Sequence, residues 1–170
     1  MSLRVVPAQP DDVAAIVSLI NTAYDVAELG DSGTAFKTTV RLLPQDVPGF
    51  ARDVASGAVL AARDGADGAG AILGVIHTTV SDGHGHFGPL AVAVSAQGRG
   101  VARALVAAAE AAASAAGAAD MRIEVVECRT DVLPVYERAG YVAYGTGDFP
   151  APERCSRPVR FILMAKKLQQ

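Results

Sequence analysis

A glycine-rich turn directly follows one apolar run and directly precedes an alanine-rich run. The turn reads Gln97-Gly98-Arg99-Gly100-Val101-Ala102. Glycines let a backbone come close to a ligand and present several N–H groups to it, and a helix N-terminus adds partial positive charge. With Arg99 and Arg103 able to add charge-assisted contacts, the turn fits a pyrophosphate. An ordinary strand-to-helix turn is the alternative that these residues leave open.

A second glycine pattern has the letters of a dinucleotide-binding fingerprint. It reads Gly83-His84-Gly85-His86-Phe87-Gly88. Such a fingerprint must follow a strand and open a helix. The residues that come next, Pro89-Leu90-Ala91-Val92, have a strand pattern instead, so we expect a hairpin turn. The sequence also lacks a phosphate-binding loop of the P-loop type.

Hydrophobic periodicity predicts the elements that position these turns. Strand patterns occupy Leu3–Pro7, Ala58–Arg63, Ala71–Ser81, Phe87–Ser95, Met121–Glu127, Tyr141–Tyr144 and Val159–Leu168. The first predicted helix is capped by Asp11 or Asp12 and has its apolar face at Val13, Ile16, Val17 and Ile20. Helix patterns follow at Ala35–Leu43 and Phe50–Ala55. Further along, the alanine helix ends at Gly117, and another helix, capped by Thr130 or Asp131, ends at Gly140. The order β-α-α-β-β-β-α-β-α-β-β predicts an α/β protein with a mixed sheet (α+β), not a regularly alternating doubly wound fold. No repeat or long linker divides the chain, so one domain is expected over residues 1–170.

Alanine dominates the composition. Of 170 residues, 33 are alanine, which raises the hydrophobic share to 51%, and twelve of them lie between Ala102 and Ala119. The same run contains Arg103 and Glu110, so it does not predict a membrane span. Small side chains there would let a helix pack closely on a sheet.

Charge and cysteine content exclude further classes. A net charge of −3 argues against a broad nucleic-acid surface. Cys128 and Cys155 lack metal-ligand spacing and are expected to be free thiols. No secretory signal pattern opens the sequence. We therefore expect a cytoplasmic protein with no metal, nucleic-acid or membrane partner.

Two segments resemble the signatures of one family. Gln97, Gly100 and Ala102 spell Q-x-x-G-x-A behind Leu90-Ala91-Val92, and a second signature is Tyr136-Glu137-Arg138-Ala139-Gly140-Tyr141. Both are similar to motifs of the GNAT (GCN5-related N-acetyltransferase) superfamily, as is the element order from about residue 4 to residue 168. The resemblance implies the GNAT-like acyl-CoA N-acyltransferase fold: a central, mostly antiparallel sheet with one splayed parallel strand pair, flanked by helices.

The same resemblance implies acetyl-CoA as co-substrate and no metal. The molecule would lie between Phe87–Ser95 and Met121–Glu127, with the backbone of Leu90, Ala91 and Val92 along its pantetheine arm. The residues implied for the pyrophosphate are Gly98, Arg99, Gly100, Val101, Ala102 and Arg103.

The implied reaction is direct attack of an amine on the thioester. Tyr136 matches the acid that protonates the departing thiolate, and an ordinary phenol is protonated at neutral pH. Glu124 and His86 both match positions at which relatives carry a base, and a structural role remains the alternative for all three residues. Arg129 departs from the family pattern, which usually has Asn there.

We therefore expect an N-acetyltransferase that acts on a primary amine of a small-molecule or peptide acceptor. A homodimer is a possible assembly. A non-catalytic CoA-binding or regulatory module and the use of another acyl-CoA are the alternatives. Two segments would form the acceptor site: Asp25–Thr34, with Asp25, Glu28 and Asp31, and Gly147–Pro158, with Glu153, Arg154 and Arg157. The first is acidic and would suit a cationic amine if it is more than a solvated loop, whereas the second is mixed, so the acceptor stays open.

Overall fold

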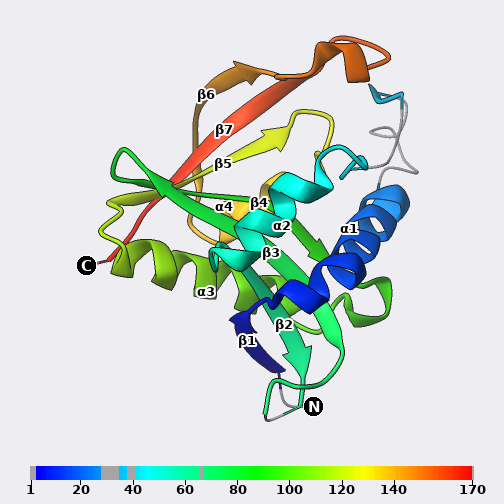
Figure 1. Cartoon of the computed structure of the whole chain (residues 1–170). Helices are drawn as coiled ribbons and strands as arrows, with labels where there is room; N and C mark the ends of the chain where they lie inside the picture. The colour runs from blue at the N-terminus through cyan, green and yellow to red at the C-terminus, as the bar shows by residue number, and fades with distance from the viewer. Residues whose placement is uncertain (1–2, 28–34, 38–40, 66, 170) are drawn as a thin grey trace.

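A seven-stranded mixed sheet forms the centre of the molecule (Figure 1). The computed structural model describes residues 3–27, 35–37, 41–65 and 67–169. Along the sheet the strands run in the order β1-β2-β3-β4-β5-β7-β6, and only β4 and β5 are parallel neighbours. The strands are β1 Leu3–Pro7, β2 Val59–Asp64, β3 Ile72–Ser81, β4 His84–Val92, β5 Asp120–Val126, β6 Val142–Asp148 and β7 Arg160–Lys167. The helices are α1 Val13–Ala27, α2 Val47–Ala55, α3 Val101–Ala115 and α4 Leu133–Arg138. The predicted element order and fold class are confirmed.

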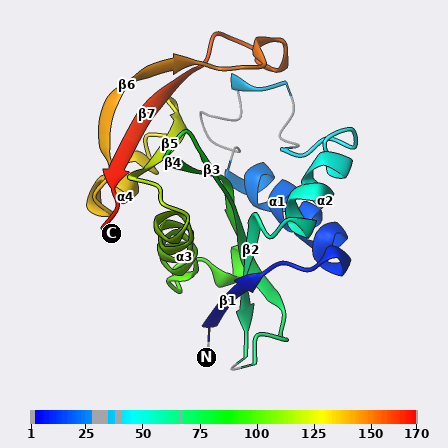
Figure 2. The same ribbon diagram turned by 60° about the vertical axis from the view of Figure 1, so that its left-hand side comes forward.

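Helices cover both faces of the sheet. Helices α1 and α2 lie on one face and α3 on the other (Figure 2). The apolar stripe of α1 is confirmed in part, since Ile16 and Ile20 are fully buried with Phe50 of α2 in one core cluster. A second cluster surrounds Leu105 of α3 and Met121 of β5. No helix among the described residues is long and apolar enough to cross a membrane.

The alanine-rich helix α3 packs directly against glycines of the sheet. Its buried positions are one helical turn apart: Val101, Leu105, Ala109 and Ala113. Opposite them stand glycines, because a Cβ at Gly74 would come within 2.9 Å of Val101 Cγ1 and one at Gly85 within 2.8 Å of Ala113 Cβ. Glycine on the strands and alanine on the helix therefore set the spacing of the two layers.

Strand β4 begins and ends three residues earlier than predicted. The preceding hairpin turns at Asp82 and Gly83, whose φ angles are 52° and 79°, so the strand resumes at His84. At its other end the chain leaves the sheet in a 3-10 turn over Val94–Ala96. The second glycine pattern thus lies in a hairpin and a strand, as expected, and opens no helix.

Two predicted helix caps and one predicted helix are wrong. Gln9 caps the 3-10 turn that leads into α1, and the Asp12 carboxylate accepts a hydrogen bond from the Gln9 N–H at 2.8 Å. Val132, not Thr130 or Asp131, precedes α4. The described parts of the expected helix at 35–43 form no α-helix: Ala35 has 3-10 conformation, and Phe36 forms a β-bridge with Cys155, because long-range contacts decide this segment. Residues 38–40 lie outside the described residues.

Strands β4 and β5 pair only where both begin. Their registered pairs are His84 with Asp120, Gly85 with Met121 and His86 with Arg122. Beyond this point β4 stays with β3, bulging at Gly88-Pro89, while β5 stays with β7. The facing edges, from Leu90 on β4 and Ile123 on β5, are therefore paired with no described strand, which is the splay that the resemblance implied.

Candidate active site

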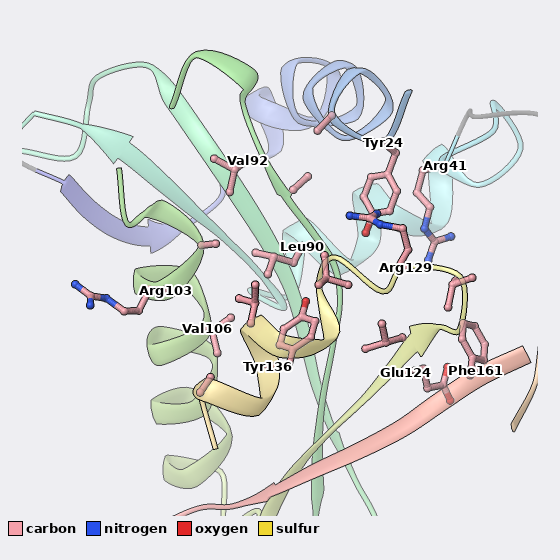
Figure 3. Close-up of a pocket in the computed structure, with 18 of the residues that line it drawn as sticks. Tyr24, Arg41, Leu90, Val92, Arg103, Val106, Glu124, Arg129, Tyr136 and Phe161 are labelled. Carbon is pink, nitrogen blue, oxygen red and sulfur yellow. The ribbon is translucent and has the colours of Figure 1, made fainter. Parts of the chain in front are cut away.

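A pocket of about 850 Å³ opens where β4 and β5 separate (Figure 3). It extends through the sheet, because its lining comes both from α3 and from the end of α1 on the opposite face. Of the twelve residues expected to act in catalysis or cofactor binding, seven line this pocket: Leu90, Ala91, Val92, Ala102, Arg103, Glu124 and Tyr136. The five that do not are His86, Gly98, Arg99, Gly100 and Val101.

The glycine turn lies between two of the lining residues, Gln97 and Ala102. Gly98 and Gly100 are exposed, with φ angles of 73° and 80°, and a Cβ at either would meet nothing within 4 Å. No side chain caps α3, whose first helical hydrogen bond runs from the Ala104 N–H to the Gly100 carbonyl. The N–H groups of residues 101–103 therefore have no helical acceptor and remain suited to an anion. Val101 is a buried core residue, so only its backbone can take part.

The splayed edge of β4 supplies backbone groups to the pocket. Leu90, Ala91 and Val92 are registered with Ile76, Val75 and Gly74 of β3 on one side, while their other edge faces the opening. Inward-facing N–H and C=O groups need partners, and an amide-containing chain laid along this edge would provide them.

Tyr136 stands in the middle of the pocket lining (Figure 3). Its ring packs against Phe87 and Tyr141, with centroid distances of 6.1 Å and 5.9 Å. Burial, and after it the nearby Tyr24, raise the pKa of its phenol to about 12 against the opposing charge of Arg129. The hydroxyl has no hydrogen-bond partner among the described side chains and backbone groups. Tyr136 is therefore a neutral phenol with an available proton.

The second sequence signature folds as a helix C-terminus that fixes this tyrosine. Gly140 has a φ of 97°, its N–H donates to the Glu137 carbonyl, and the Tyr141 N–H donates to the Tyr136 carbonyl, both at 3.0 Å. This is the Schellman arrangement, in which the residue after the glycine packs on the one that begins the last turn. The spacing of the signature thus sets the contact between the two tyrosine rings.

Tyr141 is held by a polar cluster whose other members, Glu110 and Lys166, line the pocket. Its hydroxyl donates to Glu110 at 2.8 Å, and Lys166 donates to both oxygens of the same carboxylate, at 2.8 and 3.0 Å. Burial, and then the Glu110 carboxylate, raise the pKa of Tyr141 above its ordinary value. The cluster fixes Tyr141 and hence the surface against which Tyr136 packs.

The two candidate bases occupy different places. Glu124 is exposed and lines the pocket, whereas His86 does not line it. His86 lies at the closed end of the splay, registered with Thr79 on one side and Arg122 on the other. Only Glu124 is therefore brought together with Tyr136 in the pocket lining.

Three lining residues on the side away from α3 were not predicted as site residues, namely Tyr24, Arg41 and Arg129, while Arg154 belongs to the acceptor segment expected at 147–158. The four residues come from the end of α1, the segment before α2, the loop after β5 and the turn after β6. Of the acidic wall expected at 25–34, Asp25 is exposed and does not line the pocket, while Glu28 and Asp31 lie outside the described residues. Among the described residues, the side of the pocket away from α3 has arginines in its lining instead of these carboxylates.

Comparison with known proteins identifies the architecture. Residues 55–168 match the family model described as an acetyltransferase (GNAT) domain. An N-acetyltransferase from Staphylococcus aureus has a TM-score of 0.73 at 13% identity, covering 99% of this chain and 100% of its own. A GCN5-related N-acetyltransferase from Kribbella flavida has a TM-score of 0.70 at 23% identity, covering 98% of each chain.

A third solved structure contains a ligand. The PaiA N-acetyltransferase from Thermoplasma acidophilum, in complex with coenzyme A, has a TM-score of 0.69 at 13% identity, covering 98% of this chain and 99% of its own. No protein with a curated description matches this sequence. The family match across β2 to β7, together with the splayed sheet, shows that the chain belongs to the GNAT family of acetyltransferases.

Proposed function

We propose that this protein transfers the acetyl group of acetyl-CoA to a primary amine by direct attack on the thioester. The observation that carries the proposal is the Tyr136 phenol, which lines the pocket, has a pKa of about 12 and has no hydrogen-bond partner among the described residues. A phenol of this kind keeps its proton at neutral pH, so the proton is available to the sulfur as the carbon–sulfur bond breaks.

The cofactor half of the site is the turn before α3 and the free edge of β4. Backbone groups of Leu90, Ala91 and Val92 would pair with the pantetheine amides. The turn residues would bind the pyrophosphate: Gly98, Arg99, Gly100, Val101, Ala102 and Arg103. This arrangement is supported by the two left-handed glycines and by the uncapped helix N-terminus, and by the coenzyme A in the Thermoplasma acidophilum relative.

In the reaction, the amine nitrogen forms a bond to the thioester carbonyl carbon and the carbon–sulfur bond breaks. Tyr136 donates its proton to the leaving sulfur and regains one from solvent. The proton lost by the amine goes to Glu124, directly or through water. Glu124 is favoured over His86 as this base because it shares the pocket lining with Tyr136.

An acceptor screen with acetyl-CoA, read as release of free thiol, tests the proposal. Amine-dependent thiol release with one acetylated amine per thiol supports it, and a parallel series with succinyl-CoA tests the donor. If coenzyme A bound while no amine raised thiol release above background, the protein would be a CoA-binding module and the proposal would fail.

A further inference from the structure

Arginines gather on the pocket wall opposite α3. Arg41, Arg129 and Arg154 line this wall, and Figure 3 shows Arg41 and Arg129 beside Tyr24. Carboxylates are few in the lining, since Glu110 is already bound by Lys166 and Tyr141 and only Glu124 remains on the described surface. Among the described lining residues of this side, arginines outnumber carboxylates, and Arg129 is ion-paired with Asp131 outside the lining.

One of these arginines, Arg129, acts on the proposed acid itself. The charge of Arg129 lowers the pKa of Tyr136 against the effect of burial, so its guanidinium lies within electrostatic range of that hydroxyl. Its Nε and Nη2 donate to the two Asp131 oxygens at 2.9 Å each, which fixes the guanidinium. Its side chain is 19% exposed, so the charge is only weakly screened by solvent.

Arg41 is held toward the same wall by helix α1. The Asn21 amide oxygen accepts hydrogen bonds from the backbone N–H groups of Arg41 and Leu42, at 3.0 and 2.8 Å. The Arg41 guanidinium carbon lies 5.8 Å from the centre of the Tyr24 ring. Tyr24 in turn is close enough to Tyr136 to raise its pKa. Tyr136, Tyr24 and the two arginines thus form one continuous surface.

We propose that the acceptor is a primary amine that also carries a carboxylate, of the α-amino-acid type. The inference rests on the proposed acetyl transfer and names the substrate class for the same site. Arginine binds carboxylates in a planar, two-point geometry, and such contacts would orient the amine toward the reacting centre. A polycation would find few carboxylates in the described pocket lining. The positive charge also favours the neutral form of a bound amine, which is the form that attacks.

Matched pairs of acceptors, with and without a free carboxylate, test the inference directly. Each of several amino acids, from glycine to phenylalanine, is compared with its own amide, and spermidine is the polycation. We expect kcat/KM to be about tenfold or more higher for the free acid, the loss typical of a charged hydrogen bond. The amine of the amide is less basic than that of the free acid, so more of it is in the neutral form that attacks. Amine basicity alone would therefore favour the amide, against the order that we expect. Preference for the amides or for spermidine would overturn the inference.

Two variants test the arginine wall. Arg41→Gln, at an exposed position, should raise the KM for the amino acid and abolish the preference over the amide, with the KM for acetyl-CoA unchanged. Arg41→Lys should restore part of the preference. Arg52→Gln, an exposed arginine of α2 outside this pocket, is the control and should keep the preference. A rise in the KM for acetyl-CoA alone would assign Arg41 to the cofactor and overturn the inference.

A binding measurement separates this inference from the proposed reaction. Calorimetry on the protein saturated with coenzyme A compares an N-acetyl amino acid with its N-acetyl amide, and needs no turnover. Tighter binding of the acid without any turnover would support the carboxylate site while the proposed reaction failed. Turnover with equal binding of the two products and no preference between the substrates would leave the reaction standing and overturn the carboxylate site.

Discussion

Tyr136 and Tyr141 are joined through both backbone and side chains, yet their hydroxyls have different roles. The Tyr141 N–H donates to the Tyr136 carbonyl at 3.0 Å, and their rings meet edge to face at 72°. Tyr141 donates its hydroxyl to Glu110, whereas the Tyr136 hydroxyl has no such partner among the described residues. One short motif thus supplies one structural phenol and one available for chemistry.

The pH dependence follows from the raised pKa of Tyr136. Because that pKa is about 12, the phenol stays protonated over the whole range in which the enzyme can be assayed. With a saturating amine, kcat should therefore not fall between about pH 7 and about pH 10, since the acid remains in its active form. Stopped assays of the acetylated product measure this. A descending alkaline limb in the wild type that disappears in Tyr136→Phe would contradict it.

The phosphate turn can be tested with a matched pair of glycines on one helix. Gly100 begins α3 and Gly117 follows its end, with φ angles of 80° and 84° and no atom within 4 Å of an added Cβ. Valine should strain the backbone similarly at both, by about 1–3 kcal/mol. Only Gly100→Val should also weaken coenzyme A binding, by about tenfold or more, because it obstructs the charged contacts.

Calorimetric titration with coenzyme A distinguishes the two variants, and thermal melting compares their stability. Unchanged affinity in a folded Gly100→Val protein, or an equal loss of affinity in Gly117→Val, would remove the turn from the cofactor site.

If Glu124 and not His86 is the general base, replacing each of them with glutamine should have unequal effects on kcat/KM. Glu124 lines the pocket and His86 does not, so Glu124→Gln should lower kcat/KM by about a hundredfold below the pKa of the amine. His86→Gln should leave it nearly unchanged. The Glu124 effect should shrink at alkaline pH, where the amine is already neutral. Steady-state kinetics across pH measure both, and the opposite ranking would move the base to His86.

Close packing of α3 predicts a stability loss at a strand glycine. A Cβ at Gly85 would come within 2.8 Å of Ala113 Cβ and 3.0 Å of Met121 Sδ. Gly85→Ala should therefore lower the free energy of unfolding by about 1–3 kcal/mol through overpacking. Denaturant unfolding measures the loss, and Gly83→Ala, which adds strain but no contact, is the comparison. A Gly85→Ala protein as stable as the wild type would show that close packing against α3 does not limit the side chain at this position.

Much of the fold could be predicted because the periodicity is local. Alternation in β5 and the repeat of buried positions in α3 depend on neighbours a few residues away. The segment at 35–43 could not be predicted, since Asn21 and Cys155, far away in sequence, determine its backbone contacts. The start of β4 depended on left-handed φ angles at Asp82 and Gly83, which propensity does not specify.

The candidate site also has one part that could be predicted from local motifs and one part that depends on contacts between distant segments. Tyr136 and the turn at Gly100 belong to short motifs whose spacing is set by helix ends, so their positions could be predicted. Tyr24, Arg41 and Arg129 come from separate segments that meet at the opening where β4 and β5 separate. Their chemistry, and with it the basic character of the acceptor wall, became visible only in three dimensions.

The most direct measurement for the proposed mechanism is the steady-state kinetics of Tyr136→Phe beside Tyr144→Phe. The ring of Tyr136 is packed and its hydroxyl makes no hydrogen bond within the described residues, so the Tyr136→Phe protein should fold normally. We predict that kcat falls by about a hundredfold or more while the KM for acetyl-CoA stays nearly unchanged. Tyr144, exposed on β6, should tolerate the same change. A Tyr136→Phe enzyme with wild-type kcat would contradict the assignment of Tyr136 as the acid.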